Sequence, residues 1–271
     1  MGEQLVFTAN VADFEMDYMK FGRGQKPLVI LPGMNLKSVM SLASLCVVSY
    51  KIFAEDYTIY LFDRRKEFDA NYSISAMASD TALVMKNLGI VQADVFGISQ
   101  GGVIAQTIAE ECPELVRKLV LGSSMSRANE TSDAIFKEWI RLVKTCDVDA
   151  FVSFFVDKVF SEKTARLCKQ ALVDMNHDAT ECDRERFSIM AKSCIAYDGY
   201  EALSKIKCPT LVLGASLDQV FTVKASIEMY ERLKACGTPC KIYVYEGYGH
   251  AAYDEARDYR KRILNFFREI F

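Results

Sequence analysis

The sequence predicts an α/β protein with an eight-stranded, mostly parallel sheet, helices on both faces of the sheet, and an inserted helical lid. Short apolar runs typical of buried strands alternate with segments of helical periodicity. Consecutive strands that are separated by helices are joined by parallel crossovers. At 271 residues, of which 51% are hydrophobic, the chain is long enough for one large domain that contains an insertion.

The first half of the chain supplies six of the expected strands. Apolar or alternating runs predict them, and Gly, Pro or Asp ends several of them. A helical stretch is expected from about residue 37 to 53, and another carries Ile74, Met77, Val84 and Leu88 and ends at Gly89. The predicted strands are residues 4–8, 14–20, 27–31, 57–62, 95–96 and 117–121.

The second half begins with a section that has no strand signal. Four helical segments are expected there, and we assign residues 127–200 to a lid that is inserted into a core made of residues 1–126 and 201–271. Alternation then resumes, with strands over 209–214 and 240–245 and a helix over 223–234. A closing helix over 254–271 has an apolar stripe made of Ile263, Phe266, Phe267 and Ile270.

Composition excludes several classes of function. The net charge is −3 with no basic stripe, so we expect no nucleic-acid partner, and no apolar run is long enough to span a membrane. The first residues lack the pattern of a signal peptide, which predicts a cytoplasmic protein. Nine cysteines without a C-x-x-C pair, together with two histidines, predict reduced thiols, no metal site and no cofactor. The oligomeric state stays open.

One stretch carries the chemistry. Ser99 lies in Gly97-Ile98-Ser99-Gln100-Gly101, a G-x-S-x-G pattern between a short buried strand and a helix. A serine at such a sharp corner is held in a strained conformation, and its neighbours must be glycine so that strand and helix can pass closely. The pattern predicts a nucleophile elbow, with the amide of Gln100 and the start of the helix facing a developing oxyanion.

A serine nucleophile needs a base, and the chain offers two histidines. His250 follows the last strand in a loop whose glycines, Gly247 and Gly249, let it fold back over the edge of the sheet. His177 lies in a polar connection within the expected lid, so we choose His250. A carboxylate should orient the imidazole. Asp218, after the strand 209–214, is preferred over Asp63, whose neighbouring arginines suggest a structural ion pair. Residues 122–124, after the strand 117–121, contain no acid.

The oxyanion hole needs a second amide from a loop after an early strand. Leu31-Pro32-Gly33-Met34 follows the strand 27–31, and Gly33 permits a close backbone approach. We therefore predict the amide of Met34 as the partner of the Gln100 amide.

With these residues placed, the chain resembles the α/β-hydrolase fold superfamily over nearly its full length. The residues that carry the resemblance are 97–102, 113–121, 206–214 and 249–250. The resemblance implies Ser99 as nucleophile, His250 as base, Asp218 as acid, and the amides of Met34 and Gln100 as oxyanion donors. The lid is similar to that of enol-lactonase-like and esterase-like members. One departure is Pro32, which stands where the family usually has a histidine.

These features predict a serine hydrolase that cleaves a small carboxylic ester, thioester or lactone through an acyl-enzyme on Ser99. Two alternatives stay open. The same triad could serve acyl transfer, C–C bond hydrolysis or a cofactor-free lyase reaction, or the protein could be a catalytically silent hydrolase-like ligand-binding protein. The identity and acyl-chain length of the substrate are not specified by the sequence.

Overall fold

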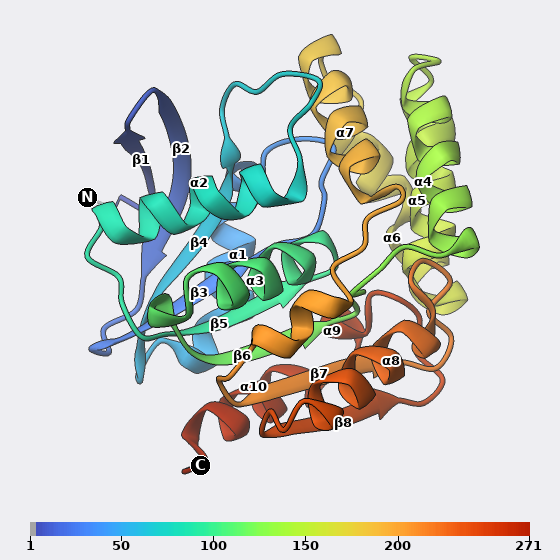
Figure 1. Cartoon of the computed structure of the whole chain (residues 1–271). Coiled ribbons are helices and arrows are strands. Elements are labelled where there is room, and N and C mark those ends of the chain that lie inside the picture. The colour runs from blue at the N-terminus through green and yellow to red at the C-terminus, as the bar shows by residue number, and fades with distance from the viewer. Residues whose placement is uncertain (1–3) are drawn as a thin grey trace.

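The structure, a computed structural model, describes residues 4–271 and contains a single eight-stranded sheet (Figure 1). The strand order is β1-β2-β4-β3-β5-β6-β7-β8. β2 pairs antiparallel with β1 and β4, and every other neighbouring pair is parallel, which confirms the predicted mostly parallel sheet. The strands are β1 Val6–Val11, β2 Phe14–Phe21, β3 Lys26–Leu31, β4 Tyr57–Arg65, β5 Ala93–Ile98, β6 Val116–Gly122, β7 Thr210–Ala215 and β8 Cys240–Tyr245.

Helices cover both faces of the sheet, and each face has its own hydrophobic core. Along β3, Val29 and Leu31 belong to one core while Leu28 and Ile30 belong to the other, because successive side chains of a strand point to opposite faces. One core includes α2 Ile74–Asn87, α3 Gln100–Glu111 and α8 Thr222–Ala235, and the other includes α1 Ala43–Tyr50 and α10 Tyr259–Arg268.

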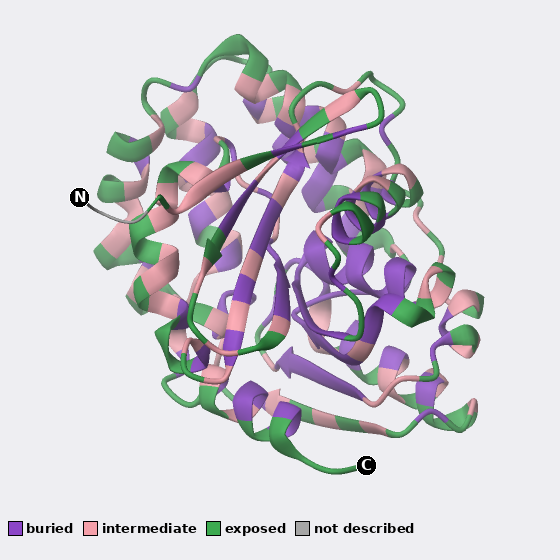
Figure 2. Cartoon of the chain, turned by 90° about the vertical axis from the view of Figure 1, so that its left-hand side faces the viewer, coloured by how far each residue is buried: buried purple, intermediate pink, exposed green. Residues whose placement is uncertain are grey.

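The middle strands are the most deeply buried part of the sheet. All residues of β5 and β7 are buried, whereas the edge strands β1 and β8 consist mostly of partly or fully exposed residues (Figure 2). A strand that is covered on both faces reads as a continuous apolar run, which is why β5 and β7 were predictable. The turn at Ser99 and the loop of Asp218 therefore start from fully buried strands.

Four helices form the insertion between β6 and β7, and Figure 1 shows them grouped to one side of the sheet. An aromatic cluster of Trp139, Phe151, Phe155 and Phe187 joins three of them. The division into core and lid, and the action of these helices as a lid, stay predictions. The helices are α4 Glu130–Val143, α5 Val148–Val159, α6 Glu162–Asn176 and α7 Glu181–Cys194.

Two predicted helices are shorter than expected. The stretch 37–53 consists of the 3-10 turn η1 Val39–Leu42, α1, and the 3-10 turn η2 Lys51–Phe53. The expected closing helix 254–271 is divided into α9 Ala252–Glu255 and α10, and Ile270 is fully exposed instead of belonging to the apolar stripe. Lys118 explains the early end of α10, because its ammonium group binds the carbonyl oxygens of Phe266, Phe267 and Glu269.

Within residues 4–271, no helix is both long and apolar enough to cross a membrane. Residues 1–3, on which the expected absence of a signal peptide partly depends, lie outside the described residues.

Candidate active site

Ser99 occupies the sharp turn between β5 and α3 with φ 54° and ψ −125°, a conformation that L-residues rarely adopt. Its amide is held by the carbonyl of Gly122 at 2.9 Å. The surrounding glycines are sterically required. A Cβ atom on Gly97 would lie 2.5 Å from the carbonyl oxygen of Gly101, and one on Gly101 would lie 2.0 Å from that of Leu31. The close approach of β3, β5 and α3 thus keeps the strained serine in place.

The structure brings together the three side chains that the sequence singled out, each from a loop that follows a parallel strand. His250 Nε2 lies 3.0 Å from Ser99 Oγ, and His250 Nδ1 lies 2.9 Å from Asp218 Oδ2. All three residues are buried. Because an ionised carboxylate can only accept, Nδ1 carries the imidazole proton, and Nε2 is left to accept the proton of the Ser99 hydroxyl.

Hydrogen bonds to both carboxylate oxygens hold the Asp218 side chain in place. Oδ2 accepts from His250, while Oδ1 accepts from the amides of Val220 at 2.8 Å and Phe221 at 3.1 Å. Burial alone would raise the pKa of Asp218, but the imidazole of His250 and the two amides outweigh burial and hold this pKa below its usual value. The carboxylate is therefore ionised at neutral pH.

A prediction for stability follows from this lowered pKa. Since the folded-state pKa lies below the unfolded value of about 3.9, the carboxylate contributes stability that is present above that pH and is lost as pH falls through the folded pKa. The melting temperature of wild type should exceed that of Asp218→Asn by more at pH 7 than at pH 3. Equal differences at both pH values, measured by circular dichroism, would contradict the assignment.

The loop after β3 runs directly against Ser99. A Cβ atom on Gly33 would lie 3.1 Å from Ser99 Cβ and 3.6 Å from Ser99 Oγ. The backbone N–H groups of Met34 and Gln100 donate no hydrogen bond to any group within residues 4–271. The residues that follow Gly33 and Ser99 thus carry amides without a partner among the described residues, and their use as an oxyanion hole is taken up as a proposal below.

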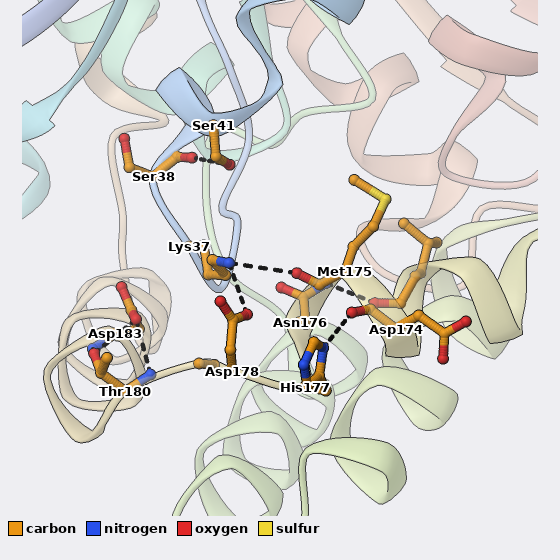
Figure 3. A network of polar contacts seen from close by, with 12 residues as sticks. Lys37, Ser38, Ser41, Asp174, Met175, Asn176, His177, Asp178, Thr180 and Asp183 are labelled. Atoms are coloured by element: carbon orange, nitrogen blue, oxygen red, sulfur yellow. Dashed lines mark hydrogen bonds and ion pairs between the residues drawn. The ribbon is translucent and has the colours of Figure 1, made fainter.

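The two rejected candidates lie elsewhere. His177 caps the end of α6, is exposed, and contacts the carbonyl of Asp174 (Figure 3). Asp63 accepts hydrogen bonds from the Ser38 hydroxyl and from the backbone amide of Arg64. The suggested structural ion pair of Asp63 with its neighbouring arginines is wrong, because the Arg64 side chain instead contacts two neutral oxygens, described below, and Arg65 pairs with Asp80 at 3.7 Å.

A cavity of about 540 Å³ opens beside the loop that carries Gly33 and Met34. Its walls come from η1 and α1 on one side and from α5 and α6 on the other, and most of its lining is apolar. At its edge, Lys37 Nζ lies 2.8 Å from Asp178 and 3.5 Å from the carbonyl oxygen of Met175, which links the loop after β3 to the end of α6 (Figure 3). The site therefore combines the hydrogen-bonded Ser99 with a neighbouring space of mostly apolar lining.

Arg64 is the site residue that sequence reasoning missed. It lies at the carboxyl end of β4, beside the end of β3, and its guanidinium contacts both the loop after β3 and Gln100. One signal could have pointed to it. Arg64 directly follows the predicted strand 57–62, and the structure places the end of this strand beside the end of β3, from which the loop with Gly33 and Met34 starts.

Residues 4–271 hold no group of three or more His, Cys, Asp or Glu side chains arranged to bind a metal ion.

Comparison with known proteins identifies the class. The family described as "alpha/beta hydrolase fold" matches residues 26–256, so the chain belongs to this hydrolase family. It is 27% identical to a protein of Rhizobium rhizogenes that bears the name carbamate hydrolase RutD, with 79% of this chain and 84% of the relative covered. It is 21% identical to 3-oxoadipate enol-lactonase 2 of Acinetobacter baylyi, with 80% of each chain covered.

Solved structures show the same fold. MGS-M2, an alpha/beta hydrolase enzyme from a deep-sea metagenome library of the Medee basin, has a TM-score of 0.86 at 20% identity and covers 98% of both chains. The enol-lactonase from Burkholderia xenovorans has a TM-score of 0.81 at 18% identity, with 97% of this chain and 100% of that chain covered. At these identities the likeness supports the fold and not a particular substrate.

Proposed function

We propose that the protein is a serine hydrolase that cleaves a small carboxylic ester, thioester or lactone through an acyl-enzyme on Ser99. The observation that carries the proposal is the continuous hydrogen-bonded order of hydroxyl, imidazole and carboxylate, with distances of 3.0 Å and 2.9 Å between successive groups. This is the arrangement that a weak serine nucleophile requires for activation. Membership of a hydrolase family adds to its support.

In the proposed reaction, Ser99 Oγ attacks the carbonyl carbon while His250 Nε2 takes the hydroxyl proton. The carbonyl oxygen becomes an oxyanion, to which the amides of Met34 and Gln100 donate hydrogen bonds. Asp218 stabilises the imidazolium, which then gives its proton to the leaving alcohol, thiol or ring oxygen. A water molecule, deprotonated by His250, attacks the acyl-enzyme, releases the acid and restores Ser99.

The cavity supports an uncharged, apolar group on the substrate. Its lining contains three charged side chains, and each is paired: Lys37 with Asp178, and Arg260 with Asp254 at 2.7 Å. A free carboxylate that entered this space would need a cation of its own, because an unpaired buried charge is costly. We therefore propose that the substrate is a neutral acyl compound rather than a diacid derivative.

The lining of the cavity should set the preferred chain length. Leu172 of α6 lines the cavity, and the larger tryptophan side chain in Leu172→Trp should shorten it. The ratio of kcat/KM for the octanoyl to that for the butyryl p-nitrophenyl ester should then fall by about tenfold, which corresponds to the loss of about two methylene contacts at about 0.8 kcal/mol each. Leu172→Ala should not lower this ratio. Leu167, on the same helix but 78% exposed and outside the cavity, gives the matched control Leu167→Trp, and an equal change in both tryptophan variants would contradict the assignment.

The proposal is tested with purified protein on a panel of esters, thioesters and lactones, together with a fluorophosphonate probe. Turnover of at least one substrate and probe attachment at Ser99, located by mass spectrometry of the digested protein, are expected. Turnover with added alcohol or thiol acceptors separates hydrolysis from acyl transfer. A folded protein that neither turns over any substrate nor reacts with the probe would overturn the proposal in favour of a silent ligand-binding protein.

A further inference from the structure

Arg64 is a buried cation with neutral partners. It is 3% exposed, and its Nη2 donates to the carbonyl oxygen of Pro32 at 2.9 Å and to the side-chain oxygen of Gln100 at 3.1 Å. Among residues 4–271, no carboxylate lies within ion-pair distance of its guanidinium, and its Nε is buried without a hydrogen-bond partner. Burial lowers the pKa of Arg64, and the negative charge of nearby Asp63, which forms no hydrogen bond to the guanidinium, opposes this shift only in part. A guanidinium keeps its charge in a protein.

Burying the charged Arg64 side chain lowers the stability of the fold. Moving a cation out of water is unfavourable, and neutral oxygens offset less of this loss of hydration than a carboxylate would. An apolar side chain of similar length would fill the same space without this penalty. Retention of the charge at this place therefore needs a reason beyond packing.

The two acceptors of Arg64 belong to the two segments that present the free amides. Pro32 is two residues before Met34, and Gln100 carries the second amide on its own backbone. These segments also touch directly, because a Cβ atom on Gly101 would lie 2.5 Å from the carbonyl oxygen of Pro32. One nitrogen atom of Arg64 thus fixes the loop after β3 relative to the start of α3.

The far end of Gln100 extends this connection to the inserted helices. Its Nε2 donates to the carbonyl oxygen of Met190 in α7 at 2.8 Å, so the amide oxygen must face Arg64. The side chain of Gln100 cannot turn over without placing its NH₂ group against the guanidinium. The order Pro32, Arg64, Gln100 and Met190 is therefore a single chain of directed hydrogen bonds.

We propose that Arg64 is a positioning residue that aligns the amides of Met34 and Gln100 and adds positive potential to the oxyanion. This inference rests on the proposed hydrolase function. Both effects act on the transition state, in which negative charge develops on the carbonyl oxygen, and leave the binding of a neutral substrate nearly unchanged.

The test compares steady-state kinetics of wild type, Arg64→Met and Arg64→Lys on a p-nitrophenyl ester. Methionine removes the charge and both hydrogen bonds at similar length, so kcat should fall by about 10²-fold while KM changes by less than about threefold. Lysine can place one ammonium group near the same oxygens, and should recover about tenfold of the lost kcat. The pH dependence of kcat should keep its shape, since Asp218 and His250 are untouched.

Arg186→Met is the matched control. Arg186 of α7 also donates to backbone carbonyls at the junction of the inserted helices with the sheet, those of Arg65 and Lys66, but it contacts neither Pro32 nor Gln100. Its kcat should stay within about threefold of wild type. If removal of any arginine at this junction lowered kcat without regard to Pro32 and Gln100, both methionine variants would lose kcat alike.

The inference is overturned if Arg64→Met keeps kcat within threefold of wild type, if lysine recovers nothing, or if Arg186→Met loses as much kcat. Should Arg64→Met not fold, Gln100→Met carries the test. This variant keeps the backbone amide of residue 100 but loses the side-chain contact with Arg64, so kcat should fall by about tenfold or more at unchanged KM. A kcat like that of wild type would overturn the inference. Wild-type protein without turnover or labelling would instead show that the proposed function itself is wrong.

Discussion

Ser99→Ala is expected to lower kcat on the best ester by about 10⁴- to 10⁶-fold, the largest effect of any single substitution in the site. The alanine methyl group has no electron pair to attack the carbonyl carbon, and water bound in its place is neither as close nor as well oriented. The measurement is p-nitrophenolate release under saturating substrate, followed by probe labelling of the same sample.

The fold of this variant should be intact, which makes the comparison clean. The Ser99 hydroxyl has a single polar partner, His250, within residues 4–271, and the strained backbone at position 99 is held by the neighbouring strands and not by the side chain. Its circular dichroism spectrum should match that of wild type. Equal turnover by the two proteins would show that hydrolysis, if present, uses another nucleophile.

Asp218→Asn should lower kcat by about 10⁴-fold through a change of tautomer. The asparagine oxygen can still accept from the amides of Val220 and Phe221, so its NH₂ group would face His250 Nδ1. The imidazole would then carry its proton on Nε2, facing the Ser99 hydroxyl, and could no longer act as a base.

Asp63→Asn provides the control for Asp218→Asn. Asp63 is also a carboxylate near the end of a strand, and it was the rival candidate in the sequence, but its oxygens serve Ser38 and the Arg64 amide. We expect its kcat to exceed that of Asp218→Asn by at least about 100-fold. Similar losses in both variants would remove the basis for choosing Asp218 as the acid.

The parts of the molecule that were predicted well are those whose cause is local. The turn at Ser99 demands glycine at positions 97 and 101 for steric reasons that act over a few residues, so the pattern is visible in the chain. The buried strands β5 and β7 read as apolar runs for a similarly simple reason. The proximity of Asp218 and His250 followed from their places after neighbouring parallel strands.

What escaped prediction depends on partners that are distant in the chain. Lys118, which lies in a strand almost 150 residues earlier in the chain, binds the last carbonyl oxygens of α10. The periodicity of residues 254–271 does not indicate this contact. Arg64 looked like half of a local ion pair, and only the assembled sheet shows that its acceptors are 32 and 36 residues away. The cavity, which needs the relative placement of α1, α5 and α6, could not be inferred from any one segment.

The contact between Gln100 and α7 has a consequence for how such a protein can diversify. Its acceptor is the main-chain carbonyl of residue 190, which any amino acid supplies. Many side chains of the inserted helices could therefore change during evolution while this hydrogen bond to the turn at Ser99 is kept. Substitutions in these helices would then require no matching substitutions in the strands that hold Ser99.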